Sequence, residues 1–161
     1  MTTPNGLDEI VAQFGDVHSY VGADGTLSAM WQTDYLAHAV LPFSLPLDWN
    51  RAVTVNKLLC HKLMVDTFEQ VFQQIVDAGL QAQIKTFGGC FMYRPQRTGN
   101  KLSTHSWGIA IDLNAFENAQ GTQGNMSMDV VRIFRTAGFK WGGDWPDKRC
   151  DAMHFQFATD Y

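Results

Sequence analysis

The sequence predicts a single α+β domain in which a small antiparallel sheet packs with helices. Its 161 residues are a usual length for one domain with a real core. Segments with helical and with extended periodicity follow one another without regular alternation, which favours an antiparallel sheet over repeated βαβ units. Hydrophobic residues at 45% and charged residues at 17% are ordinary globular values, and no internal repeat or low-complexity linker divides the chain.

Three helices are expected where apolar residues recur at three- and four-residue steps. A short helix covers residues 7–14, and a long helix covers residues 55–78, directly before a glycine. A third helix is capped by Ser127 or Asp129 and ends at Gly138.

Three strands are expected between and after these helices. Residues 81–86 form a short strand, residues 107–113 form a second, and the segment MHFQFA, residues 153–158, forms the last. The polar segment 93–104 and the segment 114–125, rich in Gly, Asn and Gln, are typical of loops.

An aspartate lies inside the second of these strands. In extended backbone Asp112 shares a face with Gly108 and Ala110, whose side chains are very small. A buried carboxylate is costly unless it is paired or bound to a metal. The small neighbours leave room for a cation beside Asp112, and the alternative is an ion pair with Arg94 or Arg97.

Two histidines accompany this aspartate. His105 lies just before the strand of Asp112, and His154 shares a face of the final strand with Gln156. Two histidines and one carboxylate suit Zn²⁺ with a fourth position left for water. Asp151, three residues before His154, is placed to act as a general base. Taken singly, each histidine is more often a surface or hydrogen-bonded residue than a metal ligand.

The remaining histidines and the cysteines predict structural roles. His18 and His38 lie in the irregular N-terminal part, and His61 lies in the expected long helix. The three cysteines are widely spaced and form no CxxC motif, so free thiols in a reducing cytoplasm are expected. They are Cys60, Cys90 and Cys150.

Charge and hydropathy exclude several classes of protein. The formal net charge of −4 and the pI near 5.6 argue against a nucleic-acid binder, which normally has a basic surface. No apolar stretch reaches the roughly 18 residues that cross a bilayer, so no integral membrane segment is expected. The N-terminal segment MTTPNGLDEIVAQFGD lacks the basic and apolar regions of a secretory signal, which predicts synthesis in the cytoplasm.

Three short motifs carry a family resemblance. Residues 103–112, STHSWGIAID, resemble the S-x-H-x-x-G-x-A-x-D signature of the VanY-like zinc peptidases. WGGDW at 141–145 and DAMHF at 151–155 resemble the W-G-G-x-W and D-x-x-H-F elements of the same family. The family contains D-alanyl-D-alanine carboxypeptidases and the L-alanyl-D-glutamate endopeptidases of phage endolysins. The similarity spans about residues 55–158, the expected catalytic core, and leaves residues 1–50 as an extension without an assigned role.

The resemblance implies the hedgehog/DD-peptidase-like fold, with one zinc ion per chain in a cleft on the sheet. It implies that His105, Asp112 and His154 are the zinc ligands and that Asp151 is the base that activates water. Nitrogen and oxygen ligands of this kind also accept cobalt, nickel or manganese.

The resemblance also implies residues that contact substrate. The family has an arginine upstream of the first histidine that binds the scissile carbonyl. Arg94 is the first candidate because it follows a small-residue turn, and Arg97 is the alternative unless it only solvates a loop. Ser103 is expected to position the substrate through a hydrogen bond, and Trp141 to wall the cleft unless it belongs to the core.

The function implied is hydrolysis of an amide bond in the stem peptide of bacterial peptidoglycan. The favoured activity is an L-alanyl-D-glutamate endopeptidase of the phage-endolysin type, made without a signal peptide and released to the cell wall through a membrane pore. The alternatives are a D-alanyl-D-alanine carboxypeptidase and a non-catalytic zinc-binding module of the same fold. Asp151 beside His154 favours an enzyme, and a monomer that binds no nucleic acid is expected.

Overall fold

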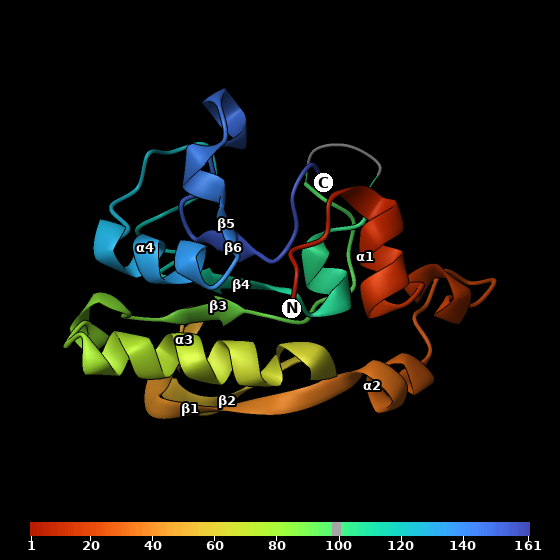
Figure 1. The fold of residues 1–161 in the computed structure, drawn as a ribbon, viewed down its shortest axis with the longest axis horizontal. Coiled ribbons are helices and arrows are strands. Elements are labelled where there is room, and N and C mark those ends of the chain that lie inside the picture. The colour runs from red at the N-terminus through yellow and green to blue at the C-terminus, as the bar shows by residue number, and fades with distance from the viewer. Residues whose placement is uncertain (98–100) are drawn as a thin grey trace.

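The computed structural model describes residues 1–97 and 101–161, which form four α-helices and one six-stranded sheet (Figure 1). The helices are α1 (Gly6–Phe14), α2 (Ala29–Tyr35), α3 (Val65–Asp77) and α4 (Met128–Thr136). The strands are β1 (Leu36–Leu47), β2 (Asn50–His61), β3 (Phe87–Gly89), β4 (Ala110–Leu113), β5 (Lys140–Trp141) and β6 (His154–Gln156). They lie in the order β2-β1-β3-β4-β6-β5. The α+β class is confirmed, but the sheet is mixed because β1 and β3 pair in parallel at Leu47 and Phe87.

The hairpin of β1 and β2 is the largest departure from the sequence prediction. Residues 55–64 were expected to begin the long helix, but they form the end of β2 and a 3₁₀ turn, and α3 begins only at Val65. The β-branched run 53–55 favours extended backbone, and β1 supplies an antiparallel partner. Leu58 and Cys60 are buried in the alternation of a strand, although their spacing also fits part of a helix.

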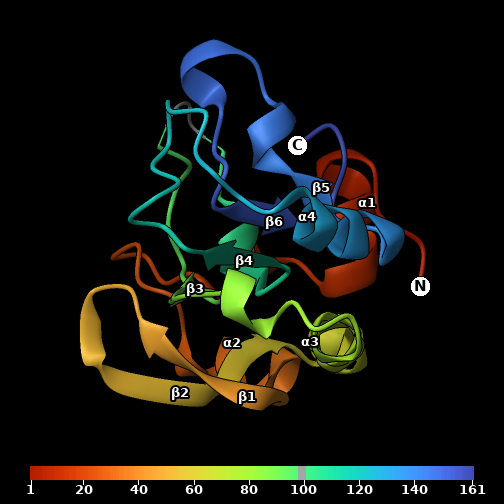
Figure 2. The same ribbon diagram turned by 90° about the vertical axis from the view of Figure 1, so that its left-hand side faces the viewer.

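Helices α3 and α4 lie on one side of the sheet (Figure 2). Helix α4 begins directly after Ser127, as predicted. Phe134 of α4 stacks on Phe155 of β6 with ring centroids 4.2 Å apart. Because side chains alternate along a strand, His154 and Gln156 then face away from α4. Within the described residues, none of the helices has the length and apolar character needed to cross a bilayer.

The segment before β3 also differs from the prediction, whereas one of the two predicted loops is present. The strand expected at 81–86 is displaced to β3, and Gln81–Gln83 form a 3₁₀ helix. The predicted loop 93–104 contains residues 98–100, which lie outside the described part of the chain. The predicted loop 114–125 is present between β4 and α4.

Strand β4 is shorter than predicted because a tight turn precedes it. Thr104–Trp107 form a 3₁₀ helix that ends at Gly108, and β4 begins at Ala110. Gly108 has a φ of +68°, and a β-carbon there would lie 2.7 Å from the backbone nitrogen of His61. Both the backbone conformation and the close approach therefore require glycine.

The N-terminal residues brace the segments that carry the predicted site. Helix α1 forms where it was predicted and lies beside the 3₁₀ helix Thr104–Trp107 (Figure 1). The indole N–H of Trp107 donates to the Gly15 carbonyl oxygen at 2.9 Å. The backbone N–H of Thr159 donates to the Pro4 carbonyl oxygen at 2.9 Å. These bonds tie the start of the chain to the turn before β4 and to the residues after β6.

Candidate active site

The strand register brings the three predicted metal ligands together. Strands β4 and β6 pair with Asp112 opposite His154, and the turn before β4 places His105 beside them. Asp112 Oδ1 lies 2.9 Å from His154 Nδ1 and 3.2 Å from His105 Nε2, and the two nitrogens are 3.2 Å apart. Donor atoms bound about 2.0–2.1 Å from a tetrahedral zinc are about 3.3 Å from one another. The three side chains therefore have the spacing of a tetrahedral metal site.

Each histidine of this cluster has one ring nitrogen bound to an acceptor outside it. His105 Nδ1 donates to the Cys90 carbonyl oxygen at 2.6 Å, and His154 Nε2 donates to Gln156 Oε1 at 3.0 Å. These acceptors assign the tautomers of the neutral rings, so His105 Nε2 and His154 Nδ1 carry lone pairs. Both lone pairs face each other and the carboxylate of Asp112. A cation between them satisfies all three groups.

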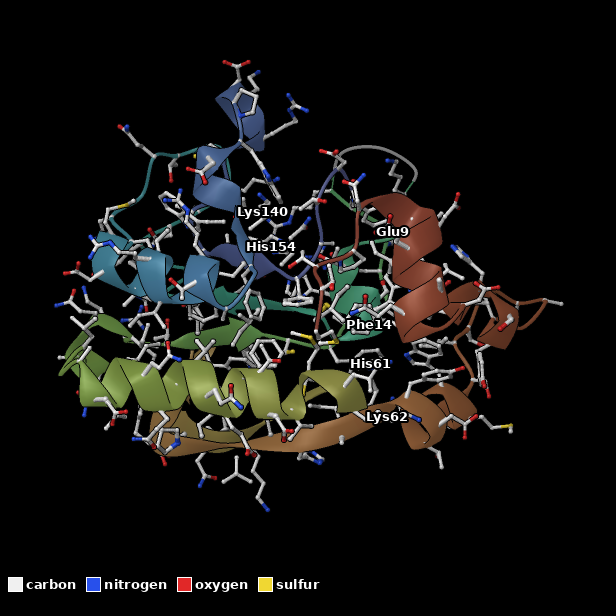
Figure 3. The ribbon with its side chains drawn as sticks, in the orientation of Figure 1. Glu9, Phe14, His61, Lys62, Lys140 and His154 are labelled. Carbon is white, nitrogen blue, oxygen red and sulfur yellow. The ribbon has the colours of Figure 1, made fainter. Side chains whose placement is uncertain are left out.

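The side chain of Gln156 is itself held in one orientation. Its Nε2 donates to the Ala158 carbonyl oxygen at 3.3 Å. Its Oε1 accepts from His154 Nε2 and, at 3.2 Å, from the hydroxyl of Thr104. Both Gln156 and Thr104 are buried. Gln156 and His154 belong to β6, which pairs with β5 beside Lys140 (Figure 3). Because the carboxamide oxygen faces His154, that histidine presents Nδ1 to the cluster.

The electrostatics of the cluster favour a positive charge at its centre. Burial raises the pKa of Asp112, but the charge of protonated His105 and the hydrogen bonds that both histidines donate once they are protonated hold that pKa below its usual range. Burial lowers the pKa of His154, but the hydrogen bond to Asp112 and its negative charge raise that pKa overall. Both shifts show that a positive charge is favoured between these side chains, and a divalent metal ion supplies such a charge.

Asp151 is positioned by the glycine-rich segment that follows β5. Its backbone N–H donates to the Gly142 carbonyl oxygen at 2.9 Å, and a β-carbon at Gly142 would lie 2.5 Å from the Asp151 carbonyl oxygen. Burial raises the pKa of Asp151 to about 6, and the charges of His154 and Arg97 act in the opposite direction. Its Oδ1 atom is buried and has no hydrogen-bond partner among the described residues. A carboxylate with these properties is suited to accept a proton near neutral pH.

A cleft of about 470 Å³ opens over the cluster. Its lining includes the predicted residues Arg94, Arg97, Ser103, Asp112, Asp151 and His154. Ser103 also has a structural part, since its hydroxyl accepts the His105 backbone N–H at 3.4 Å and its own N–H donates to the Arg94 carbonyl oxygen at 2.9 Å. The turn that carries His105 is thereby tied to the loop that carries both arginines.

Trp141, which was expected to wall the cleft, is not among the residues that line it and lines a neighbouring cavity. Its indole N–H donates to the Ala152 carbonyl oxygen at 2.8 Å, and the Arg135 guanidinium lies 5.8 Å from the centre of its ring. Trp145 lines the cleft instead, with its ring centroid 5.4 Å from that of His154. The second tryptophan of the WGGDW motif therefore walls the cleft, while the first packs against the segment before β6.

Sequence reasoning missed four groups that shape the site: the Cys90 carbonyl, Thr104, Trp145 and Gln156. The alternation of the last strand places Gln156 on the face of His154, so a signal for Gln156 was present. Trp145 belongs to a recognised motif, but the motif does not indicate which tryptophan faces the cleft. A backbone carbonyl leaves no signal in the sequence.

Together, a two-histidine, one-carboxylate cluster and a buried carboxylate at the wall of the same cleft are typical of a catalytic metal centre. Residues 96–157 match the family model described as D-alanyl-D-alanine carboxypeptidase, and this segment contains His105, Asp112, Asp151 and His154. The match confirms the resemblance to the VanY-like zinc peptidases and supports a metallopeptidase. No curated protein matches the chain.

Proposed function

We propose that this protein is a zinc-dependent L-alanyl-D-glutamate endopeptidase that cleaves the stem peptide of peptidoglycan, in the manner of a phage endolysin. The observation that carries the proposal is the cluster of His105, Asp112 and His154 with Asp151 at the wall of the same cleft. The motifs of these residues also lead us to assign the hedgehog/DD-peptidase-like fold. A module that only binds zinc does not need a buried carboxylate such as Asp151 in the same cleft.

The donor set fits zinc, with His105 Nε2, His154 Nδ1 and Asp112 Oδ1 as the three ligand atoms. Zinc supplies Lewis acidity in sites of this kind and brings the pKa of water to about 7. Asp151 accepts the proton of the attacking water and passes it to the leaving amine. With a pKa of about 6, Asp151 is ionised at neutral pH and is still basic enough to accept that proton.

An arginine of the cleft binds the oxygen of the scissile carbonyl, where negative charge develops. The Arg94 guanidinium donates to the Pro95 carbonyl oxygen at 3.3 Å, whereas the charge of Arg97 acts on Asp151. Arg97 therefore replaces Arg94 as the first candidate for this role, and Arg94 becomes the alternative. One preorganised donor at such a position is commonly worth about 3 kcal/mol.

The shape of the cleft favours an endopeptidase over a carboxypeptidase. A second cavity of about 670 Å³ shares five lining residues with the first: Lys101, Trp145, Arg149, Gln156 and Tyr161. The binding region therefore continues past these residues instead of closing beside the cluster. An endopeptidase needs room for the peptide on both sides of the cleaved bond, while a carboxypeptidase needs room for one terminal residue on the leaving side.

Mass spectrometry of purified peptidoglycan, digested by the zinc-loaded protein and in parallel by the Asp151→Ala variant, tests this function. We expect new L-alanine C-termini and D-glutamate N-termini with the wild type and neither with the variant. Release of terminal D-alanine alone would assign a carboxypeptidase. A folded, zinc-loaded wild type that cleaves nothing would refute both peptidase activities.

A further inference from the structure

The cleft is rich in positive charge although the whole chain carries a formal net charge of −4. Four cationic side chains line it: Arg94, Arg97, Lys101 and Arg149. Its acidic lining residues are Asp112, which belongs to the metal cluster, and Asp151. Within the described residues, none of the four cations takes part in an ion pair. Unpaired cations concentrated in a cleft attract an anionic ligand.

Lys101 and Arg149 have a special position among the four, because each lines both cavities. They therefore stand at the boundary between the cavity over the metal cluster and the second cavity. The Lys101 ammonium lies 5.1 Å from the centre of the Tyr161 ring, which also lines both cavities and supports the lysine through a cation–π contact.

Acidic residues of the second cavity do not cancel this charge. Asp144 is paired with the Arg135 guanidinium at 2.5 Å. Asp160 also lines this cavity, where Lys140 adds a further positive charge. The junction of the two cavities therefore keeps the positive charges of Lys101 and Arg149 available to a ligand.

We propose that Lys101 and Arg149 bind a free carboxylate of the substrate next to the cleaved bond, so that the enzyme distinguishes acidic peptides from their amidated forms. An arginine binds a carboxylate through paired hydrogen bonds, and a lysine adds a point charge. A primary carboxamide has nearly the same shape but no charge, and its NH₂ group opposes the donors of both side chains. This inference rests on the proposed peptidase function and adds a substrate preference to it.

Three synthetic peptides that contain L-alanyl-D-glutamate separate the possible sources of the carboxylate. The first carries a free glutamate α-carboxylate, the second has that group as a primary amide, and the third has only its C-terminal carboxylate amidated. Cleavage of each is measured with the wild type, the Lys101→Gln/Arg149→Gln double variant and the matched control Lys57→Gln, whose lysine is exposed on the β1–β2 hairpin.

We expect the wild type to cleave the free-acid peptide with a kcat/KM at least about tenfold above that for the internal amide, because charge-assisted hydrogen bonds are lost. The double variant should reduce this ratio to within about twofold, and Lys57→Gln should retain it. The C-terminal amide should be cleaved like the free acid. A wild type indifferent to internal amidation, a preference that survives in the double variant, or sensitivity to C-terminal amidation alone would overturn the proposal.

Binding to the Asp151→Asn variant separates this proposal from the proposed function. If the wild type cleaves none of the peptides, the endopeptidase function fails, and calorimetric affinities for the first two peptides still decide the carboxylate preference. Tighter binding of the free acid that disappears when Lys101→Gln and Arg149→Gln are added supports it. Equal binding of the two peptides, or none of either, contradicts it.

Discussion

Two regions of the molecule bury histidines, and they treat them in opposite ways. At the end of β2, His61 Nε2 lies 3.0 Å from the Phe14 carbonyl oxygen, and its Nδ1 accepts the Leu63 backbone N–H at 3.2 Å. Figure 3 shows His61 beside Phe14 and away from His154. Each ring nitrogen of His61 thus has a backbone partner that complements it. Burial lowers the pKa of His61 to about 4, so the ring is neutral at ordinary pH.

At the β4–β6 cluster, His105 and His154 each have one nitrogen satisfied by an acceptor and a second that faces further acceptors. The cluster therefore lacks a hydrogen-bond donor between the neutral rings and Asp112, whereas both ring nitrogens of His61 have complementary partners. Burial does not separate the two kinds of histidine, since all three are nearly inaccessible to solvent. Counting hydrogen-bond donors and acceptors separates the candidate ligands His105 and His154 from the structural histidine His61.

Removing one histidine of the β4–β6 cluster is expected to have the largest effect. We expect His154→Ala to lose more than about 100-fold in zinc affinity, beyond the usual effect of changing a group that only orients a ligand. Peptidase activity should fall with the metal content. Metal analysis after dialysis against a weak chelator measures the loss, and His61→Gln is the matched control that should keep stoichiometric zinc. Equal retention of zinc by both variants would contradict the assigned ligands.

A change at Asp151 should separate the metal from the chemistry. Asp151→Asn keeps the shape of the side chain but removes the base, and we expect kcat to fall by about 10²–10⁴-fold. Zinc content should remain that of the wild type because Asp151 does not belong to the ligand cluster. Parallel measurement of kcat and metal content tests both statements. Loss of zinc in this variant would make Asp151 a ligand instead of a base.

The cluster could be predicted from the sequence because its information is local. Asp112 and His154 lie on strands where side chains alternate, and the apolar residues beside each define which face is free. The cap at Ser103 and the turn at Gly108 were not predicted, because residues 93–104 were expected as a loop and residues 107–113 as a strand. Short-range patterns therefore selected His105, Asp112 and His154, which the structure brings together.

The β1–β2 hairpin could not be predicted in the same way. Its apolar residues near Leu58 fit both a helix and a strand, and its turn after Leu47 contains no glycine. Asp48 holds this turn instead, because its Oδ1 accepts the Thr86 hydroxyl at 2.9 Å and the Phe116 backbone N–H at 3.2 Å. Partners so distant in sequence leave no local signal. The different roles of Trp141 and Trp145 also could not be predicted, because the motif itself gives no local signal for them.

A smaller effect is expected when the hydrogen-bond acceptor of His154 Nε2 is removed. In Gln156→Leu the ring of His154 keeps its place, but Nε2 loses the acceptor that directs Nδ1 to the cluster. We expect zinc affinity to fall by about 10–100-fold, as for other groups that orient ligands. Competition with a chromophoric chelator measures the affinity. Gln156→Glu keeps an acceptor and should retain most of it, so an equal loss in both variants would exclude the orienting role.

The smallest expected effect concerns His61 and the pH dependence of stability. The unfolded chain protonates a histidine near pH 6.5, while the folded state resists protonation of His61 until about pH 4. Above this window His61 is neutral in both states, so its burial does not lower the free energy of unfolding. As the pH falls from 6.5 towards 4, only the unfolded chain gains the proton, and the free energy of unfolding decreases. The loss is at most about 3 kcal/mol in the free energy of unfolding. Urea titrations of the metal-free protein at several pH values measure it, with His61→Gln expected to flatten the slope and the exposed His38→Gln to preserve it. If the free energy of unfolding of His61→Gln depended on pH as it does in the wild type, the acid sensitivity would arise at the β4–β6 cluster instead, where Asp112 and His154 bind a proton between them.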